Sequence, residues 1–341
     1  MPEQPPFMIR DLAAAVVRPL DEAQVPYVLF GRMTMGLVGS EGPEEDIEIV
    51  VPDESFQAAI DAFTASTFEA CTDRACKELN EDRHPEVDQF VEITEEQMNK
   101  NREDQVYFGA FRYHPIPPVH FHLEPLPLVL SFFRQSHLLW WLPQIEPGAP
   151  APDDPHFVLS TNATRLPPKG LPEWEGLKGL QVLGLDNVSS GPWSHLYPIK
   201  VLTAEAHVEA SILLLCRDLH AIHKLDWRWF CQLYSLAERK VPGQRREDAQ
   251  YKIREEFRPF WDLFRGHVPV EKHTDIFATL LELRKALLAR GELPDARASD
   301  PADPPRFLLT EDCGASEEYD RAMAIGAEPW IGYKLFALDL N

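Results

Sequence analysis

The chain has 341 residues, 44% of them hydrophobic, and a formal net charge of −22 at pH 7. This length and apolar content predict a globular protein with a large core and two domains. An acidic surface repels the phosphate backbone, so general nucleic-acid binding is disfavoured, although a local basic groove for tRNA is not excluded.

The sequence shows no membrane or export signal. It has no run of about 18 apolar residues, and its first residues lack a basic segment followed by an apolar one. Its five cysteines form no CxxC pair, which favours reduced thiols over a disulfide framework. We therefore expect a cytoplasmic protein with no membrane partner.

The first part of the chain mixes helices and strands. Apolar patterns and turn residues predict helices over Ile9–Ala23 and Ser55–Phe63, and strands over Val25–Phe30, Asp46–Val51, Phe68–Cys71, Gln105–Tyr113 and Val119–Leu123. Asp53 or Ser55 is the expected cap of the second helix. The apolar run Leu126–Trp141 is either a core helix or part of an interaction surface.

The later part of the chain reads as helical. Helices are expected over Thr203–Ile222, Asp226–Ala237, Asp248–Phe264 and Lys272–Ala289, with Thr203 as a cap and Gly291 as a terminator. Shorter elements are expected over Ser316–Ile325 and Trp330–Leu340. The predicted fold class is α+β: a mixed sheet with flanking helices in residues 1–145, a linker with partial sheet elements in 146–200, and a helical bundle in 201–341.

One pair of acids is spaced for metal chemistry. Asp46 and Glu48 are two residues apart on a predicted strand, so their carboxylates leave the same face. Such a pair suits Mg²⁺ or Mn²⁺, which prefer oxygen ligands. Glu124 is the candidate third acid of a two-metal site. The alternative interpretation is a polar stripe on a half-buried strand.

Other polar and aromatic groups favour structural interpretations. His120 and His122 share one strand face, but no known zinc spacing joins them to Cys71 or Cys76. His207 is expected on a polar helix face. The aromatic cluster around Trp229 is expected in the core.

The order of elements around the acids resembles the nucleotidyltransferase superfamily. An apolar strand ends in glycine, and a short helix, a loop and a D-x-E strand follow, in the stretch LFGRMTMGLVGSEGPEEDIEIVV. This stretch is similar to the abortive-infection-type nucleotidyltransferase toxins and their fungal relatives. Gly31 matches the first conserved glycine of that pattern, and Gly36 or Gly39 matches the later one. Arg32 stands where the family has Gly or Ser.

The resemblance covers residues 27–65 well and 198–236 loosely. In the second stretch, Lys224 and Asp226 resemble the family's K-x-x-D element. The resemblance implies metal ligation and catalysis by Asp46, Glu48 and Glu124. It implies substrate binding by Gly31, Arg32, Lys224 and Asp226.

The implied activity is metal-dependent transfer of a nucleotidyl group from a nucleoside triphosphate to an unidentified acceptor. Two alternatives stay open. The scaffold can serve another group transfer, such as tRNA-dependent cyclodipeptide formation, or a catalytically inactive nucleotidyltransferase-like binding module.

Overall fold

The computed structural model describes residues 9–38, 46–65, 68–72, 117–123, 129–167, 191–218, 225–237, 251–266 and 273–294. Within these residues the protein is an α+β fold built on a six-stranded mixed sheet. The predicted elements at 105–113, 316–325 and 330–340 lie outside the described residues.

The strands run in the order β3-β4-β2-β1-β6-β5 across the sheet. Their bounds are β1 Val28–Phe30, β2 Ile47–Val51, β3 Val119–His122, β4 Val129–Arg134, β5 Phe157–Leu159 and β6 Lys200–Leu202. β1 is antiparallel to β2 and parallel to β6, while β2 is parallel to β4. The two edge strands, β3 and β5, are antiparallel to their neighbours. The strands before residue 145 and after it therefore share one sheet.

The pleat of the sheet separates two unlike faces. One face presents aliphatic and aromatic side chains, such as Ile47 and Ile49 of β2 and Phe132 of β4. Phe63 of helix α2 packs edge-on against Phe121 and Phe132 there. The other face carries Glu48 in the same row as Phe30 of β1 and Ser131 of β4, because directly paired residues point the same way.

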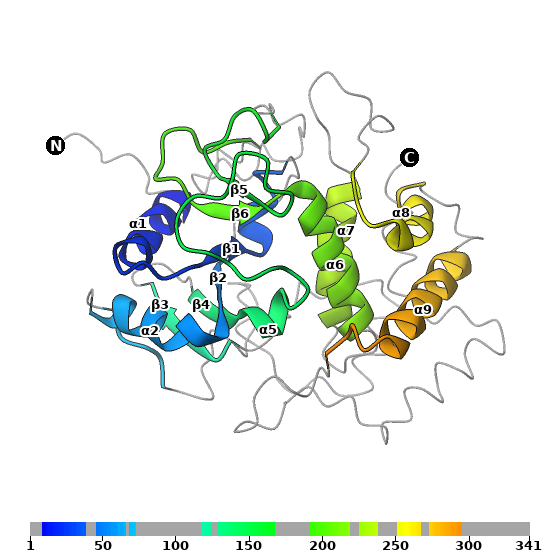
Figure 1. The fold of residues 1–341 in the computed structure, drawn as a ribbon, viewed down its shortest axis with the longest axis horizontal. Coiled ribbons are helices and arrows are strands. Elements are labelled where there is room, and N and C mark those ends of the chain that lie inside the picture. The colour runs from blue at the N-terminus through cyan, green and yellow to red at the C-terminus, as the bar shows by residue number, and fades with distance from the viewer. Residues whose placement is uncertain are drawn as a thin grey trace, which may run out of the picture.

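Helices cover both faces. Figure 1 shows α1 (Ile9–Glu22) and α2 (Phe56–Thr64) on one side of the strands and α6 (Ala204–Asp218) and α7 (Leu225–Ala237) on the other. Phe30 stacks on His207 of α6 and contacts Trp229 of α7. The hydrophobic core runs continuously from α1 through the sheet into these helices.

Several predicted boundaries are confirmed. α1 and α6 begin close to their expected starts, and the Thr203 hydroxyl accepts the Ala206 N–H as the cap of α6. Helix α9 (His273–Ala289) ends in a Schellman motif, in which Gly291 and Glu292 donate to Leu288 and Leu287. Gly291 has a φ of +68°, which explains glycine at this position.

Other predictions are corrected. The apolar run 126–141 is neither a core helix nor an exposed surface where the structure describes it, because β4 occupies the sheet interior and only the short α5 (Gln135–Leu138) is helical. A strand buried on both faces has no alternation, so its pattern cannot be told from that of a buried helix. The helix predicted over 248–264 starts later, as η5 (Glu255–Phe257) and α8 (Arg258–Arg265).

The predicted cap of α2 is wrong. Ser55 makes no side-chain capping bond, and η2 (Asp53–Ser55) precedes the helix instead. The Asp53 carboxylate accepts the backbone N–H and the hydroxyl of Ser136 on α5, at 3.0 and 2.6 Å. A tertiary contact has replaced the local cap.

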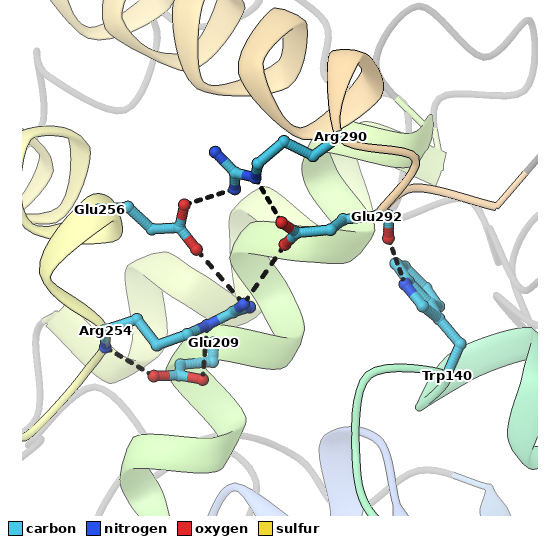
Figure 2. Close-up of polar contacts among 6 residues, drawn as sticks. All are labelled: Trp140, Glu209, Arg254, Glu256, Arg290 and Glu292. Carbon is cyan, nitrogen blue, oxygen red and sulfur yellow. Dashed lines mark hydrogen bonds and ion pairs between the residues drawn. The ribbon is translucent and has the colours of Figure 1, made fainter.

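A network of salt bridges joins the later helices. Arg254, just before η5, contacts Glu209 of α6, Glu256 of η5 and Glu292 after α9 (Figure 2). The Trp140 indole N–H donates to the Glu292 carbonyl at 2.8 Å, which ties the segment after α5 to the end of α9. Among the described residues, no helix combines the length and apolar character needed to cross a membrane.

Candidate functional site

The glycine turn after β1 lies directly against the acid pair of β2. Gly31 has a φ of +82°, and a Cβ built on it would lie 2.0 Å from Oε2 of Glu48. Only a residue without a side chain therefore fits between β1 and this carboxylate. The short 3₁₀ helix η1 (Arg32–Thr34) starts at this turn, and three-residue turns continue it to Val38.

Glu48 is a buried carboxylate with a basic partner. Its side chain is 3% exposed, and its Oε2 lies 2.5 Å from Nη2 of Arg228, itself 6% exposed. Arg228 comes from α7, 180 residues along the chain. A charge-assisted bond of this kind offsets the cost of removing both ions from water.

Asp46 lies immediately before β2, two residues before Glu48 and so on the same face of the sheet. It is 5% exposed. Its Oδ1 accepts the backbone N–H of Val129 at 2.8 Å, which fixes the start of β4 beside the start of β2. Because a carboxylate has about four acceptor positions, neither this bond nor the Arg228 contact alone saturates the two acids.

His207 of α6 contacts the glycine turn through the Thr34 side chain. Its Nε2 lies 3.0 Å from Oγ1 of Thr34, whose hydroxyl donates to the Gly31 carbonyl at 2.8 Å. Since the hydroxyl proton is used for that carbonyl, the hydroxyl accepts from a protonated Nε2, and the ring is the neutral Nε2–H tautomer. Burial lowers the pKa of His207 to about 3. The prediction of a polar helix face is wrong for this residue, which is 1% exposed.

The sheet face that carries Glu48 also carries two histidines on β3, and a cysteine lies beside them. Ser131 of β4 pairs with both Glu48 and His120, and His120 lies on edge strand β3. Cys71 donates its backbone N–H to the His120 carbonyl at 2.9 Å. Cys71, His120 and His122 place one ligand atom each within 4.8 Å of one another. The spacing of these residues in the sequence does not predict a shared site. The bridge between Ala70 and Phe121 brings Cys71 beside the two histidines.

The remaining predicted site residues divide into two groups. Arg32 is half-buried at the start of η1, one residue after the glycine turn. Asp226 lies in the first turn of α7. Glu124, Lys224 and Gly39 lie outside the described residues.

Sequence reasoning missed Arg228. The signal was an arginine between two tryptophans in the otherwise apolar run LDWRWFCQLYSLA. A cation in such a helix needs a buried acidic partner, and the two acids on the predicted Asp46–Val51 strand were candidates for that partner.

The chain was compared with protein-family models, curated proteins and solved structures. No protein-family model, no curated protein and no solved structure matches the chain.

Proposed function

We propose that this protein is a nucleotidyltransferase-like enzyme that transfers a nucleotidyl group from a nucleoside triphosphate to an acceptor hydroxyl. The observation that carries the proposal is the contact between the Gly31 turn and Glu48. This contact supports the proposal because the sequence resemblance implies a phosphate-binding role for Gly31 and a metal-binding role for Glu48. The same proposal includes a nucleotidyltransferase-like core in residues 1–145 and a helical bundle in residues 201–341.

The donor set fits a hard divalent cation. Asp46 and Glu48 leave the same face of one strand and supply only carboxylate oxygens, which suits Mg²⁺ or Mn²⁺. When bound, the cation lowers the pKa of the acceptor hydroxyl and neutralises charge on the phosphates. Glu124 is the proposed third acid.

Arg228 has a second role in this proposal. In the structure its guanidinium neutralises Glu48. Because guanidinium binds phosphate as well as carboxylate, Arg228 would also be able to bind the triphosphate beside Glu48. Arg32, Lys224 and Asp226 complete the proposed substrate contacts.

Gly31 has no side chain of its own, so the backbone N–H groups of its turn would contact phosphates bound beside Glu48 and Arg228. In the reaction the acceptor oxygen bonds to the α-phosphorus, the bond to the β-phosphate breaks, and pyrophosphate leaves. The acceptor proton passes to Asp46 or to solvent.

The test is calorimetric titration of the full chain with each of the four ribonucleoside triphosphates, with and without Mg²⁺. We expect Mg²⁺-dependent binding of at least one nucleotide, which Asp46→Asn abolishes. Asp61→Asn, on the exposed side of α2, is the matched control and should bind as the original chain does. No Mg²⁺-dependent binding of any of the four nucleotides would refute the proposal.

A second assay separates an enzyme from a binding module. Release of pyrophosphate from the bound nucleotide, with cell extract as a source of acceptor, indicates transfer. Binding without release would favour the inactive binding module.

A further inference from the structure

We propose that Cys71, His120 and His122 form a zinc site at the β3 edge of the sheet, separate from the acid pair. The site needs no nucleotidyl transfer, so this inference does not rest on the proposed function. It rests on three ligands that two separate segments bring to the same face.

Strand pairing explains why the three side chains converge. Ala70 forms an antiparallel bridge with Phe121, which puts Cys71 opposite His120. Directly opposite residues of an antiparallel pair point to the same face, and so do residues two apart on one strand. Cys71, His120 and His122 therefore share a face, while Ala70 and Phe121 point to the other.

The distances are close to those of a bound ion. The cysteine sulfur and one nitrogen of each histidine all lie within 4.8 Å of one another. Zn–N bonds of about 2.0–2.1 Å and Zn–S bonds of about 2.3 Å in a tetrahedron put these ligand atoms about 3.3–3.6 Å apart. Small rotations about the side-chain bonds close the difference. His120 is buried, while Cys71 and His122 are half-buried, so an ion can reach the site from one side.

The donor set selects the metal. One thiolate and two imidazoles are ligands for zinc and other borderline metals, whereas Mg²⁺ takes oxygen. Three protein ligands leave the fourth tetrahedral position to water or to a small ligand. The overall charge of −22 adds a general attraction for cations.

The site is distinct from the acid pair on the same face. Glu48 lies on β2 and Asp46 immediately before it, and β4 lies between β2 and β3. Two strand spacings amount to roughly 10 Å, which is too far for one ion to contact both groups. A metal on the cysteine and histidines would instead join the 68–72 segment to the edge strand. It would close a loop of about 49 residues between Cys71 and His120, which stabilises the folded chain by restricting the unfolded one.

The experiment uses the full chain, purified without a metal-binding tag and stripped with a chelator. We expect Zn²⁺ to bind at one ion per chain by calorimetry and to raise the melting temperature, since it binds the folded state. Co²⁺ serves as a spectroscopic probe. Its complex should show a near-ultraviolet thiolate-to-cobalt band and the intense visible bands of tetrahedral coordination.

Three variants decide the assignment. Cys71→Ser should abolish the thiolate band, and His120→Gln or His122→Gln should weaken Zn²⁺ binding by at least about tenfold. His122 is half-buried, so its substitution keeps the test informative even if Cys71→Ser or His120→Gln fails to fold. Circular dichroism checks the fold of each variant.

Two matched controls use the same residue types elsewhere. Cys231→Ser on α7 and His156→Gln, just before β5 at the opposite edge of the sheet, should leave the Co²⁺ spectrum and the Zn²⁺ affinity unchanged. The proposal is overturned if no Zn²⁺ binds, or if binding survives both Cys71→Ser and His122→Gln. The proposal is also overturned if Asp46→Asn loses the cobalt bands while the Cys71 and His122 variants keep them, because the ion would then lie at the acid pair.

Discussion

Arg228 of α7 and Glu48 of β2 lie 180 residues apart in the chain, and their charged groups meet at 2.5 Å in the buried interior. This pair joins the helical part of the protein to the centre of the sheet. It also neutralises one of the two acids that the sequence singled out for metal binding.

We expect either single substitution in this pair to be costly. Glu48→Gln removes the carboxylate charge 2.5 Å from the buried Arg228 guanidinium, and Arg228→Met removes the cation beside the buried Glu48. Removing one member of a buried ion pair costs about 3–5 kcal/mol of the free energy of unfolding. Urea denaturation of the two variants measures this cost.

The double variant separates charge burial from packing. Glu48→Gln combined with Arg228→Met removes both charges, so its loss should be well below the sum of the single losses. Additive losses would show that the two groups are not coupled.

Gly31 gives a sharper prediction about the turn. Gly31→Ala combines a left-handed backbone with a Cβ that meets Oε2 of Glu48 at 2.0 Å. The carboxylate cannot move away cheaply because Arg228 holds it. We expect a loss of about 3 kcal/mol or more, measured by thermal or urea unfolding.

Two other glycines act as controls for this prediction. Gly291→Ala has the same handedness problem, with a φ of +68°, but its Cβ meets nothing within 4 Å. It should cost only about 1–2 kcal/mol. Gly36→Ala has neither problem and should be close to neutral. Equal losses at Gly31 and Gly291 would contradict the steric argument.

His207 makes stability depend on pH. Its pKa is lowered to about 3 in the folded state by burial, against about 6.5 in the unfolded chain. Between these values the unfolded state binds the proton and the folded state does not. The free energy of unfolding therefore falls as the pH drops below about 6.5, by up to about 1.4 kcal/mol per pH unit from this residue.

Substitution of His207 tests that slope. His207→Gln should reduce the pH dependence of urea unfolding between pH 6.5 and 4. Thr34→Val, which removes the hydrogen-bond partner but no titratable group, should lower stability and keep the slope. An unchanged slope in His207→Gln would mean that other groups dominate acid unfolding.

The salt bridges around Arg254 contribute less to the free energy of unfolding than the buried pair does, and their contribution depends on salt. Arg254 has a side chain 35% exposed and contacts acids on three segments at 3.3–3.7 Å (Figure 2). We expect Arg254→Met to lower the free energy of unfolding by about 1 kcal/mol at low salt, and by less at 1 M salt. Lys285→Met breaks the isolated surface pair with Glu282 and should change stability little at either salt concentration.

The repeating local patterns of the chain determined much of the first half. The strand that ends at Gly31 follows from a continuous apolar run before a glycine. The acids two apart before and within β2, and the histidines two apart on β3, share a face because the strand period is two. Helix signals also worked where the caps are local, as at Thr203 and Gly291. Such features depend on residues within a few positions of one another.

Only the tertiary structure decided the partners of these residues. It set Arg228 against Glu48, His207 behind the Gly31 turn, and Cys71 beside His120. It also made a central strand of residues 129–134, where the sequence pattern left helix or surface open. The physical reason is that strand register and helix packing are settled by burial across the whole core, which joins residues that no local spacing relates.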